Sequence, residues 1–159
     1  NLVAAAEQAA DISDKQVVVV PTKSIPQGVA AILAFNTEES LERNENIMNG
    51  VIGLIKTGEV TEAVRGVKIG DLSVDPGQLI GLLEHELTVT GTNIEQVVLA
   101  LLDKAGVNDG DLVTLYWGDL VSEEIARNTA QAATNRFPLA EIEIVEGGQP
   151  HYHFFVSIE

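Results

Sequence analysis

The sequence has 159 residues, of which 45% are hydrophobic, 21% are charged and 4% are aromatic, and its formal net charge is −15 at pH 7. This composition is typical of a globular protein with a sizeable core and differs from that of disordered or membrane-embedded chains. The acidic residues are dispersed along the chain, so their field repels phosphate backbones and anionic lipids, which argues against a nucleic-acid partner.

The lack of cysteine excludes a disulfide framework and a thiolate metal site, which permits a reducing compartment. No apolar run approaches the roughly 18 residues that a membrane span needs, so we expect a soluble, cytoplasmic protein. The chain starts inside a helical pattern and shows no signal peptide. We therefore expect it to be a fragment of a longer polypeptide.

The first predicted elements are a helix and a strand. Small apolar residues recur at helical spacing over residues 2–12, which predicts a short helix. The continuous β-branched run Val17–Val20, ended by Pro21, is typical of a strand that is covered on both faces in a parallel sheet.

Two further helices are predicted before residue 57. The segment Val29–Phe35 reads as a helix, with Ser24 as a candidate N-cap and Pro26 near the first turn. A longer helix is predicted to start near Thr37 and to run to about Lys56, because its apolar residues broadly keep a helical period.

Between residues 57 and 91, glycines separate short β-rich runs, which predicts an antiparallel meander or a small second sheet. The predicted strands are Val60–Val64, Val67–Ile69, Leu79–Leu83 and Leu87–Thr90.

The C-terminal part is predicted to return to alternating strands and helices. Thr92 and Glu95 have the spacing of a capping box, which would open a helix over residues 93–105. The remaining predicted elements are strand Leu112–Trp117, a helix from the Ser122 cap to Arg136, and strands Ala140–Val145 and Tyr152–Ile158.

These elements predict an α/β fold: an open, mainly parallel sheet covered by helices, with a β-rich antiparallel insert. We expect one domain over residues 1–159, in which residues 1–56 and 92–159 form the α/β part and residues 57–91 form a second lobe.

The loop after the first predicted strand holds the first candidate site. Ligands of open α/β sheets bind beyond the carboxyl ends of strands, which makes Thr22, Lys23, Ser24 and Gln27 candidates for binding an anion. No glycine-rich phosphate loop accompanies them, so a capped turn between strand and helix is the favoured alternative. The later polar group Asp119, Ser122 and Glu123 is explained by N-capping.

The spacing His151-x-His153 would place two imidazoles on one face of a strand, as in some metal sites. The sequence provides no third ligand, so two half-exposed strand residues are the favoured interpretation. His85 is expected to be a solvated hairpin residue. No serine lies in a nucleophile-elbow pattern, and no paired carboxylates share an obvious site. The residues alone therefore indicate no catalytic constellation.

Four stretches together resemble the C-terminal domain of the fatty acid kinase A family, which are bacterial dihydroxyacetone-kinase-like proteins. They are Gln16–Asn36 with its motif Val-Val-Pro-Thr-Lys-Ser-Ile-Pro-Gln-Gly, Thr57–Arg65, the run Gly-Asp-Leu-Val-Thr-Leu from Gly110, and Glu146–Pro150 with its motif Gly-Gly-Gln-Pro. The resemblance spans nearly the whole chain.

The resemblance implies an α/β fold related to the DegV-type and dihydroxyacetone-kinase folds. It implies that ATP and magnesium bind in a separate N-terminal domain, so that this part holds no cofactor and is not catalytic. The larger enzyme phosphorylates a fatty acid presented by a DegV-like fatty-acid-binding partner, in the service of phospholipid synthesis. The C-terminal domain would then help to dock that partner, with the rest of its own polypeptide as a second contact.

The resemblance also suggests which residues contact a ligand or partner. Asn1 resembles the last residue of an Asn-containing loop, and the loop 22–27 and the run Gly147, Gly148 and Gln149 are the other candidates. His151 and His153 depart from the family pattern, which keeps the metal hypothesis open. An anion- or acyl-phosphate-binding enzyme site at Thr22–Ser24 is the alternative function.

Overall fold

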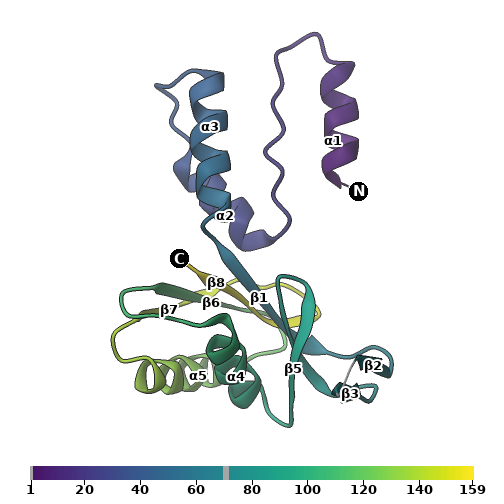
Figure 1. The fold of residues 1–159 in the computed structure, drawn as a ribbon, viewed down its shortest axis with the longest axis vertical. Coiled ribbons are helices and arrows are strands. Elements are labelled where there is room, and N and C mark those ends of the chain that lie inside the picture. Colours follow the sequence, from purple (N-terminus) through teal and green to yellow (C-terminus); the bar gives the residue numbers. More distant parts are fainter. Residues whose placement is uncertain (1, 70–71) are drawn as a thin grey trace. The chain divides into compact units, whose positions relative to one another are not determined.

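The computed structural model describes residues 2–69 and 72–159, and the chain divides into two compact units, Asn1–Ile55 and Lys56–Glu159. Figure 1 shows the helices and strands of both units. The sequence suggested a separate lobe for residues 57–91, whereas the structure draws its division at Ile55. Among the described helices, none is long and apolar enough to cross a membrane.

The N-terminal unit contains helices α1 (Leu2–Asp11), α2 (Ile25–Ala34) and α3 (Leu41–Ile52). The helix predicted over residues 2–12 is confirmed. The predicted strand Val17–Val20 is wrong: the segment is extended but forms no ladder, and Val17 is 47% exposed. A strand needs a neighbour for its backbone hydrogen bonds, and this unit has no strand among its described residues.

Caps set the bounds of α2 and α3. The Ser24 cap and Pro26 in the first turn are confirmed, but α2 starts at Ile25 and not at Val29. Helix α3 starts after Ser40, whose Oγ accepts a hydrogen bond from the Arg43 N–H at 3.1 Å. It starts later than predicted because residues 36–40 form a turn instead.

That turn is held by Asn44, a buried polar residue of α3. Its Oδ1 accepts from the Asn36 N–H, and its Nδ2 donates to the Asn36 carbonyl, both at 2.8 Å. A buried amide satisfied in this way fixes the approach of the chain to the helix.

The C-terminal unit is built on a mixed six-stranded sheet in the order β5-β4-β1-β8-β6-β7. The strands are β1 (Lys56–Glu62), β4 (Leu79–Leu83), β5 (Glu86–Gly91), β6 (Leu112–Trp117), β7 (Glu141–Glu146) and β8 (Tyr152–Ile158); β2 (Val67–Ile69) and β3 (Leu72–Val74) form a separate hairpin.

The expectation of a mainly parallel sheet is wrong, because only β6 and β7 pair in parallel among the described strands. The C-terminal strand β8 lies antiparallel between β1 and β6 and joins two halves of one sheet. The β-rich segment is therefore one half of the main sheet, except for the β2–β3 hairpin.

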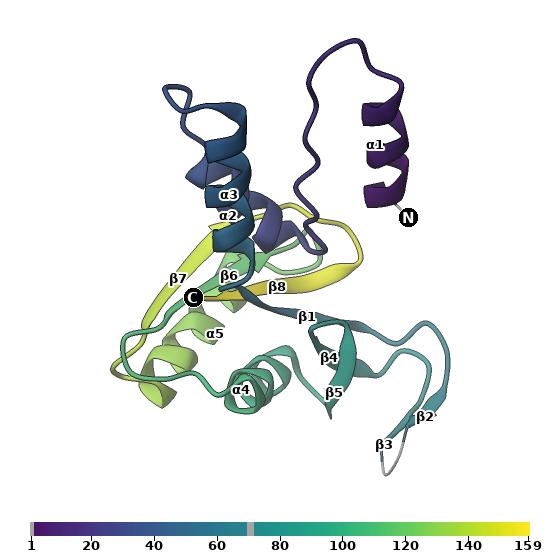
Figure 2. The ribbon, with the colours of Figure 1, turned by 45° about the horizontal axis from the view of Figure 1, so that its top comes forward.

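Helices α4 (Ile94–Ala105) and α5 (Glu123–Arg136) lie on the same side of this sheet (Figures 1 and 2). Alternate strand residues meet them, which gives a core with apolar side chains from both layers. Its fully buried members include Val60, Val97, Val98, Leu101, Leu102, Val113, Leu115, Ala126, Phe154 and Val156. The intervening residues, such as Tyr116 and Phe155, point to the opposite face.

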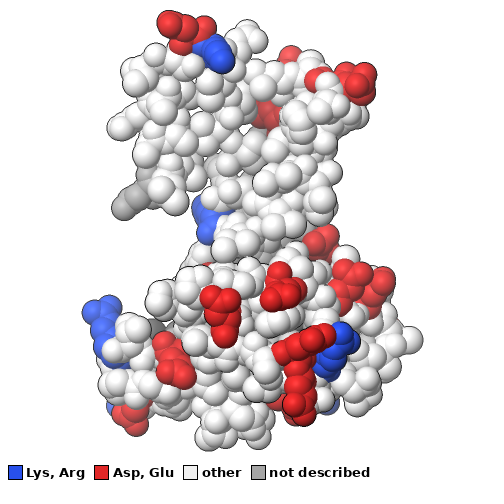
Figure 3. Space-filling view, turned by 180° about the vertical axis from the view of Figure 1, so that it is seen from behind, with Lys and Arg blue, Asp and Glu red and all other residues white. Residues whose placement is uncertain are grey.

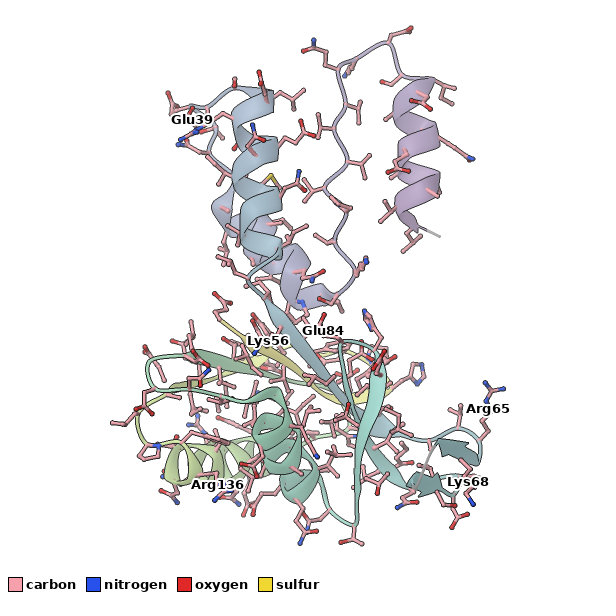
Figure 4. All side chains as sticks on the ribbon, in the orientation of Figure 1. Glu39, Lys56, Arg65, Lys68, Glu84 and Arg136 are labelled. Atoms are coloured by element: carbon pink, nitrogen blue, oxygen red, sulfur yellow. The ribbon has the colours of Figure 1, made fainter. Side chains whose placement is uncertain are left out.

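Two polar contacts tie the C-terminal end of α4 to its neighbours. Lys56 Nζ donates to the Ala105 carbonyl at 3.2 Å, and Arg136 Nη2 lies 3.1 Å from Asp103 Oδ1; Lys56 and Arg136 are labelled in Figure 4. A cation at a helix C-terminus is favourable because the last carbonyls carry partial negative charge.

The structure confirms the predicted N-cap of α5 and contradicts the predicted N-cap of α4. Ser122 caps α5 as predicted, accepting from the Ile125 N–H at 3.3 Å. Helix α4 is capped by Asn93, which accepts from the Gln96 N–H at 2.8 Å, so the capping box predicted at Thr92 is wrong.

Candidate functional site

The predicted loop 22–27 spans the start of α2: residues 22–24 precede the helix, and residues 25–27 form its first turn. Its polar groups form a closed cap. Ser24 Oγ accepts from the Gln27 N–H at 3.3 Å, and Gln27 Oε1 accepts from the Lys23 N–H at 2.8 Å. The hydroxyl and the amide oxygen are therefore engaged with the backbone. What the loop still offers is the Lys23 side chain, which is exposed and forms no ion pair with a described residue.

The second predicted group, Gly147–Gln149, lies in the connection from β7 to β8. Gln149 is buried, and its Nε2 donates to the Tyr116 carbonyl at 2.8 Å. A methyl group on Gly147 would lie 2.1 Å from Gln149 Oε1, so only glycine leaves room for this amide. The Gly-Gly-Gln run therefore connects the segment before β8 to the end of β6 through the hydrogen bond from Gln149 to Tyr116.

Gly118 takes part in the same contact between the end of β6 and the segment that leads into β8. The sequence pattern indicates this glycine only as the end of a strand. Its N–H donates to the His153 carbonyl at 3.0 Å, and a Cβ there would meet the carbonyl oxygens of Tyr152 at 2.2 Å and Gln149 at 2.5 Å. A glycine directly after a buried strand was the available sign of this close approach.

The two histidines proposed for a metal do not share a strand face. His151 precedes β8, is exposed and has a positive φ of 71°, and its carbonyl accepts from Thr61 Oγ1 at 2.6 Å. His153 is buried within β8, at a shift in register between β1 and β8. Among the described residues no group of three metal-ligating side chains occurs.

His153 has an unusual polar environment. Its Nδ1 is buried and has no hydrogen-bond partner among the described residues, and its Nε2 lies 4.0 Å from Glu62 Oε1. Burial lowers the pKa of His153 from its ordinary value, although the Glu62 carboxylate acts in the opposite direction. The ring is therefore neutral at physiological pH.

A second polar cluster lies on the sheet face away from α4 and α5. His85, in the β4–β5 turn, has its Nδ1 3.0 Å from Glu59 Oε1, and Tyr152 packs on Phe155 with ring centroids 4.7 Å apart. Burial, and then the Glu59 carboxylate, raise the pKa of Tyr152, so its phenol stays protonated. His85 is exposed in a hairpin, as expected, and is also held by a carboxylate.

Glu84, the residue before His85, connects the β4–β5 turn to strand β1. Glu84 and His85 both have positive φ, 49° and 67°. Glu84 Oε1 accepts from the backbone N–H of Thr57 and from its hydroxyl; Glu84 is labelled in Figure 4. These contacts compensate for a backbone conformation that glycine or asparagine would adopt more easily.

The predicted candidates are distributed over both units. The loop 22–27 belongs to Asn1–Ile55, whereas Gly147–Gln149 and both candidate metal ligands belong to Lys56–Glu159. Asn1 lies outside the described residues. Each group is consequently a local feature of its own unit.

A groove of about 460 Å³ between the first turn of α4 and one side of α5 was not predicted. Its lining is mostly apolar. The residues of this α4–α5 groove are Leu79, Asn93, Ile94, Glu95, Ile125, Asn128 and Thr129. The pair Ile125 and Thr129 at helical spacing on α5 was a sequence signal, but which helix would face them depends on tertiary structure.

Acidic side chains are spread over the face shown in Figure 3 and outnumber the basic ones there. Arg127 and Arg136 are both engaged, with Glu123 and Asp103 respectively. The surface of the chain is therefore suited to basic partners rather than to anionic ones.

Comparisons with known proteins agree with this fold. A family model for the C-terminal region of fatty acid kinase A and similar proteins matches residues 1–159. An uncharacterized protein of Staphylococcus epidermidis is 34% identical over all 159 residues, and one of Staphylococcus aureus is 33% identical over the same span. The chain spans 29% of the length of each of these relatives.

Among solved structures, a DegV-family protein from Ruminococcus gnavus, described with vaccenic acid, matches with a TM-score of 0.52. The match covers 84% of this chain and 54% of that protein at 12% sequence identity. At this identity the similarity concerns the fold.

Proposed function

Because this chain belongs to the family of C-terminal domains of fatty acid kinase A-like proteins, we propose that it docks a DegV-like protein that carries the fatty acid. The ATP- and magnesium-binding site would lie in another domain of the same polypeptide, which phosphorylates the docked acid. The observation that carries the proposal is the family match over residues 1–159.

The local structure supports a docking role. The hydroxyl of Ser24 and the amides of Gln27 and Gln149 are engaged in hydrogen bonds within the chain. Polar groups used in this way stabilise a rigid surface and are not free to act on a substrate. A rigid surface with acidic character favours association with a partner that presents basic side chains.

The test is titration calorimetry between the full-length protein that carries this chain and the DegV-family proteins of the same organism, loaded with a fatty acid. We expect saturable binding by the full-length protein and by a variant in which its ATP site is disabled. If no DegV-family protein binds while the fold is intact by circular dichroism, the docking function is wrong.

The alternative function, anion or acyl-phosphate binding at Thr22–Ser24, is favoured by one observation: Lys23 is exposed and forms no ion pair with a described residue. Acetyl phosphate is a suitable probe. If this loop is a ligand site, Lys23→Ala abolishes acetyl phosphate binding and leaves the unfolding midpoint unchanged. Absence of binding by the unmodified protein eliminates this alternative.

A further inference from the structure

The α4–α5 groove lies at the N-terminal ends of two helices that run in the same direction. Arg136 and Asp103 join the C-terminal ends of α5 and α4, whereas the groove is lined by residues 93–95 at the start of α4 and by residues 125–129 at the start of α5. The first residue of β4, Leu79, also lines it. All of these residues belong to Lys56–Glu159, so the groove is a feature of one unit.

The lining combines an apolar surface with polar side chains. Leu79, Ile94 and Ile125 provide the apolar surface, and Ile125 is 42% exposed although it lies next to the core. Thr129 lines the groove and is only 1% exposed. The Asn128 amide is exposed beside it. This arrangement fits an apolar side chain whose neighbouring backbone polar groups bond to the exposed Asn128 amide.

The charges around the groove select the occupant. Glu95 lines it and forms no ion pair with a described residue. A free fatty acid, a phosphate or an anionic membrane would bring like charge to this carboxylate. A second copy of the chain would bring a net charge of −15 to another of −15.

We propose that the α4–α5 groove receives an apolar side chain of the docked partner, carried on a segment where Lys or Arg residues flank it. The apolar residue is the anchor, and a flanking cation pairs with Glu95, which lines the groove. This inference rests on the proposed docking function and specifies the surface that performs it.

The test compares two lysine substitutions on α5 in the full-length protein. Asn128→Lys places a cation and a longer side chain in the groove, whereas Asn135→Lys makes the same change at an exposed position that does not line it. Calorimetry with the fatty-acid-loaded DegV-family protein is expected to give a Kd at least about tenfold higher for Asn128→Lys. For Asn135→Lys the Kd is expected to stay within about twofold of the unmodified value.

Ile125→Ser provides a second variant that removes the apolar anchor surface without changing charge, and circular dichroism checks the fold of each variant. It is also expected to weaken binding by about tenfold. If the unmodified protein binds and both groove variants bind equally well, the groove assignment is wrong while the docking function stands. If the unmodified protein does not bind, both are wrong.

Discussion

His153 shows how one buried side chain makes stability depend on pH. Its folded pKa lies below the ordinary value of 6.5 because of burial. The unfolded chain therefore takes up a proton that the folded chain binds only at lower pH. The free energy of unfolding is expected to decrease as the pH falls from about 6.5 through the folded pKa. Above that range the stability is fully present and no longer depends on the protonation of this residue.

The measurement is the urea midpoint of the intact chain at about pH 7 and about pH 5, compared with His153→Gln, which cannot titrate. The variant is expected to lose less stability between the two pH values. His151→Asn, an exposed change outside the strand, is the control and should retain the full decrease. An equal decrease in all three proteins would show that carboxylates alone cause it.

Gly118 is required for a steric reason. Its missing methyl group would lie 2.2 Å from the Tyr152 carbonyl oxygen, a backbone atom that cannot move without disturbing β8. Gly118→Ala is expected to destabilise the C-terminal unit by about 1–3 kcal/mol, the usual cost of overpacking. Denaturant unfolding followed by the fluorescence of Trp117, the single tryptophan, measures this.

The control for that substitution is Gly28→Ala, since a methyl group on this α2 residue meets no atom within 4 Å. Alanine is favoured over glycine in a helix by up to about 1 kcal/mol, so this change should leave the free energy of unfolding unchanged or raise it. Unfolding followed by far-UV circular dichroism measures this. A neutral Gly118→Ala would contradict the proposed close approach.

At the scale of elements, the N-terminus of α4 distinguishes two possible caps. Asn93 Oδ1 accepts from the Gln96 N–H, whereas Thr92 Oγ1 donates to the Gln96 side chain at 3.1 Å and satisfies no backbone group. Asn93→Ala is expected to cost about 1 kcal/mol in the free energy of unfolding, and Thr92→Ala less than about 0.5 kcal/mol. Equal costs, measured by urea unfolding, would restore the predicted capping box.

Element prediction succeeded where local pattern and burial agree. Leu112–Trp117 and Tyr152–Ile158 have the predicted bounds, because each apolar run finds a neighbouring strand on both sides. Val17–Val20 has an equally strong β-branched run but no partner strand in its unit among the described residues. Propensity measures how well side chains fit a pleated surface, and it does not provide that surface.

At the scale of the whole molecule, the class α/β could be predicted but the sheet order could not. The pairing of β1 with β8 joins segments at opposite ends of the C-terminal unit, so no local signal specifies it. For the candidate site too, local features could be predicted from the sequence, but features that depend on long-range contacts could not. The Ser24 cap was visible in the sequence, whereas the α4–α5 groove exists only because Ile125 and Ile94 are brought together by the fold.

Net charge gives the last prediction at this scale. With a formal charge of −15 and dispersed acids, the chain is expected to attract the proposed basic segment of its partner from a distance. The association rate constant with the DegV-family protein should therefore fall steeply between about 0.05 M and about 0.5 M salt, because the Debye length shortens. The dissociation rate should change much less, since an apolar anchor in the groove is insensitive to screening. Stopped-flow mixing measures both rates, and an association rate that is independent of salt would contradict electrostatic steering by this acidic surface.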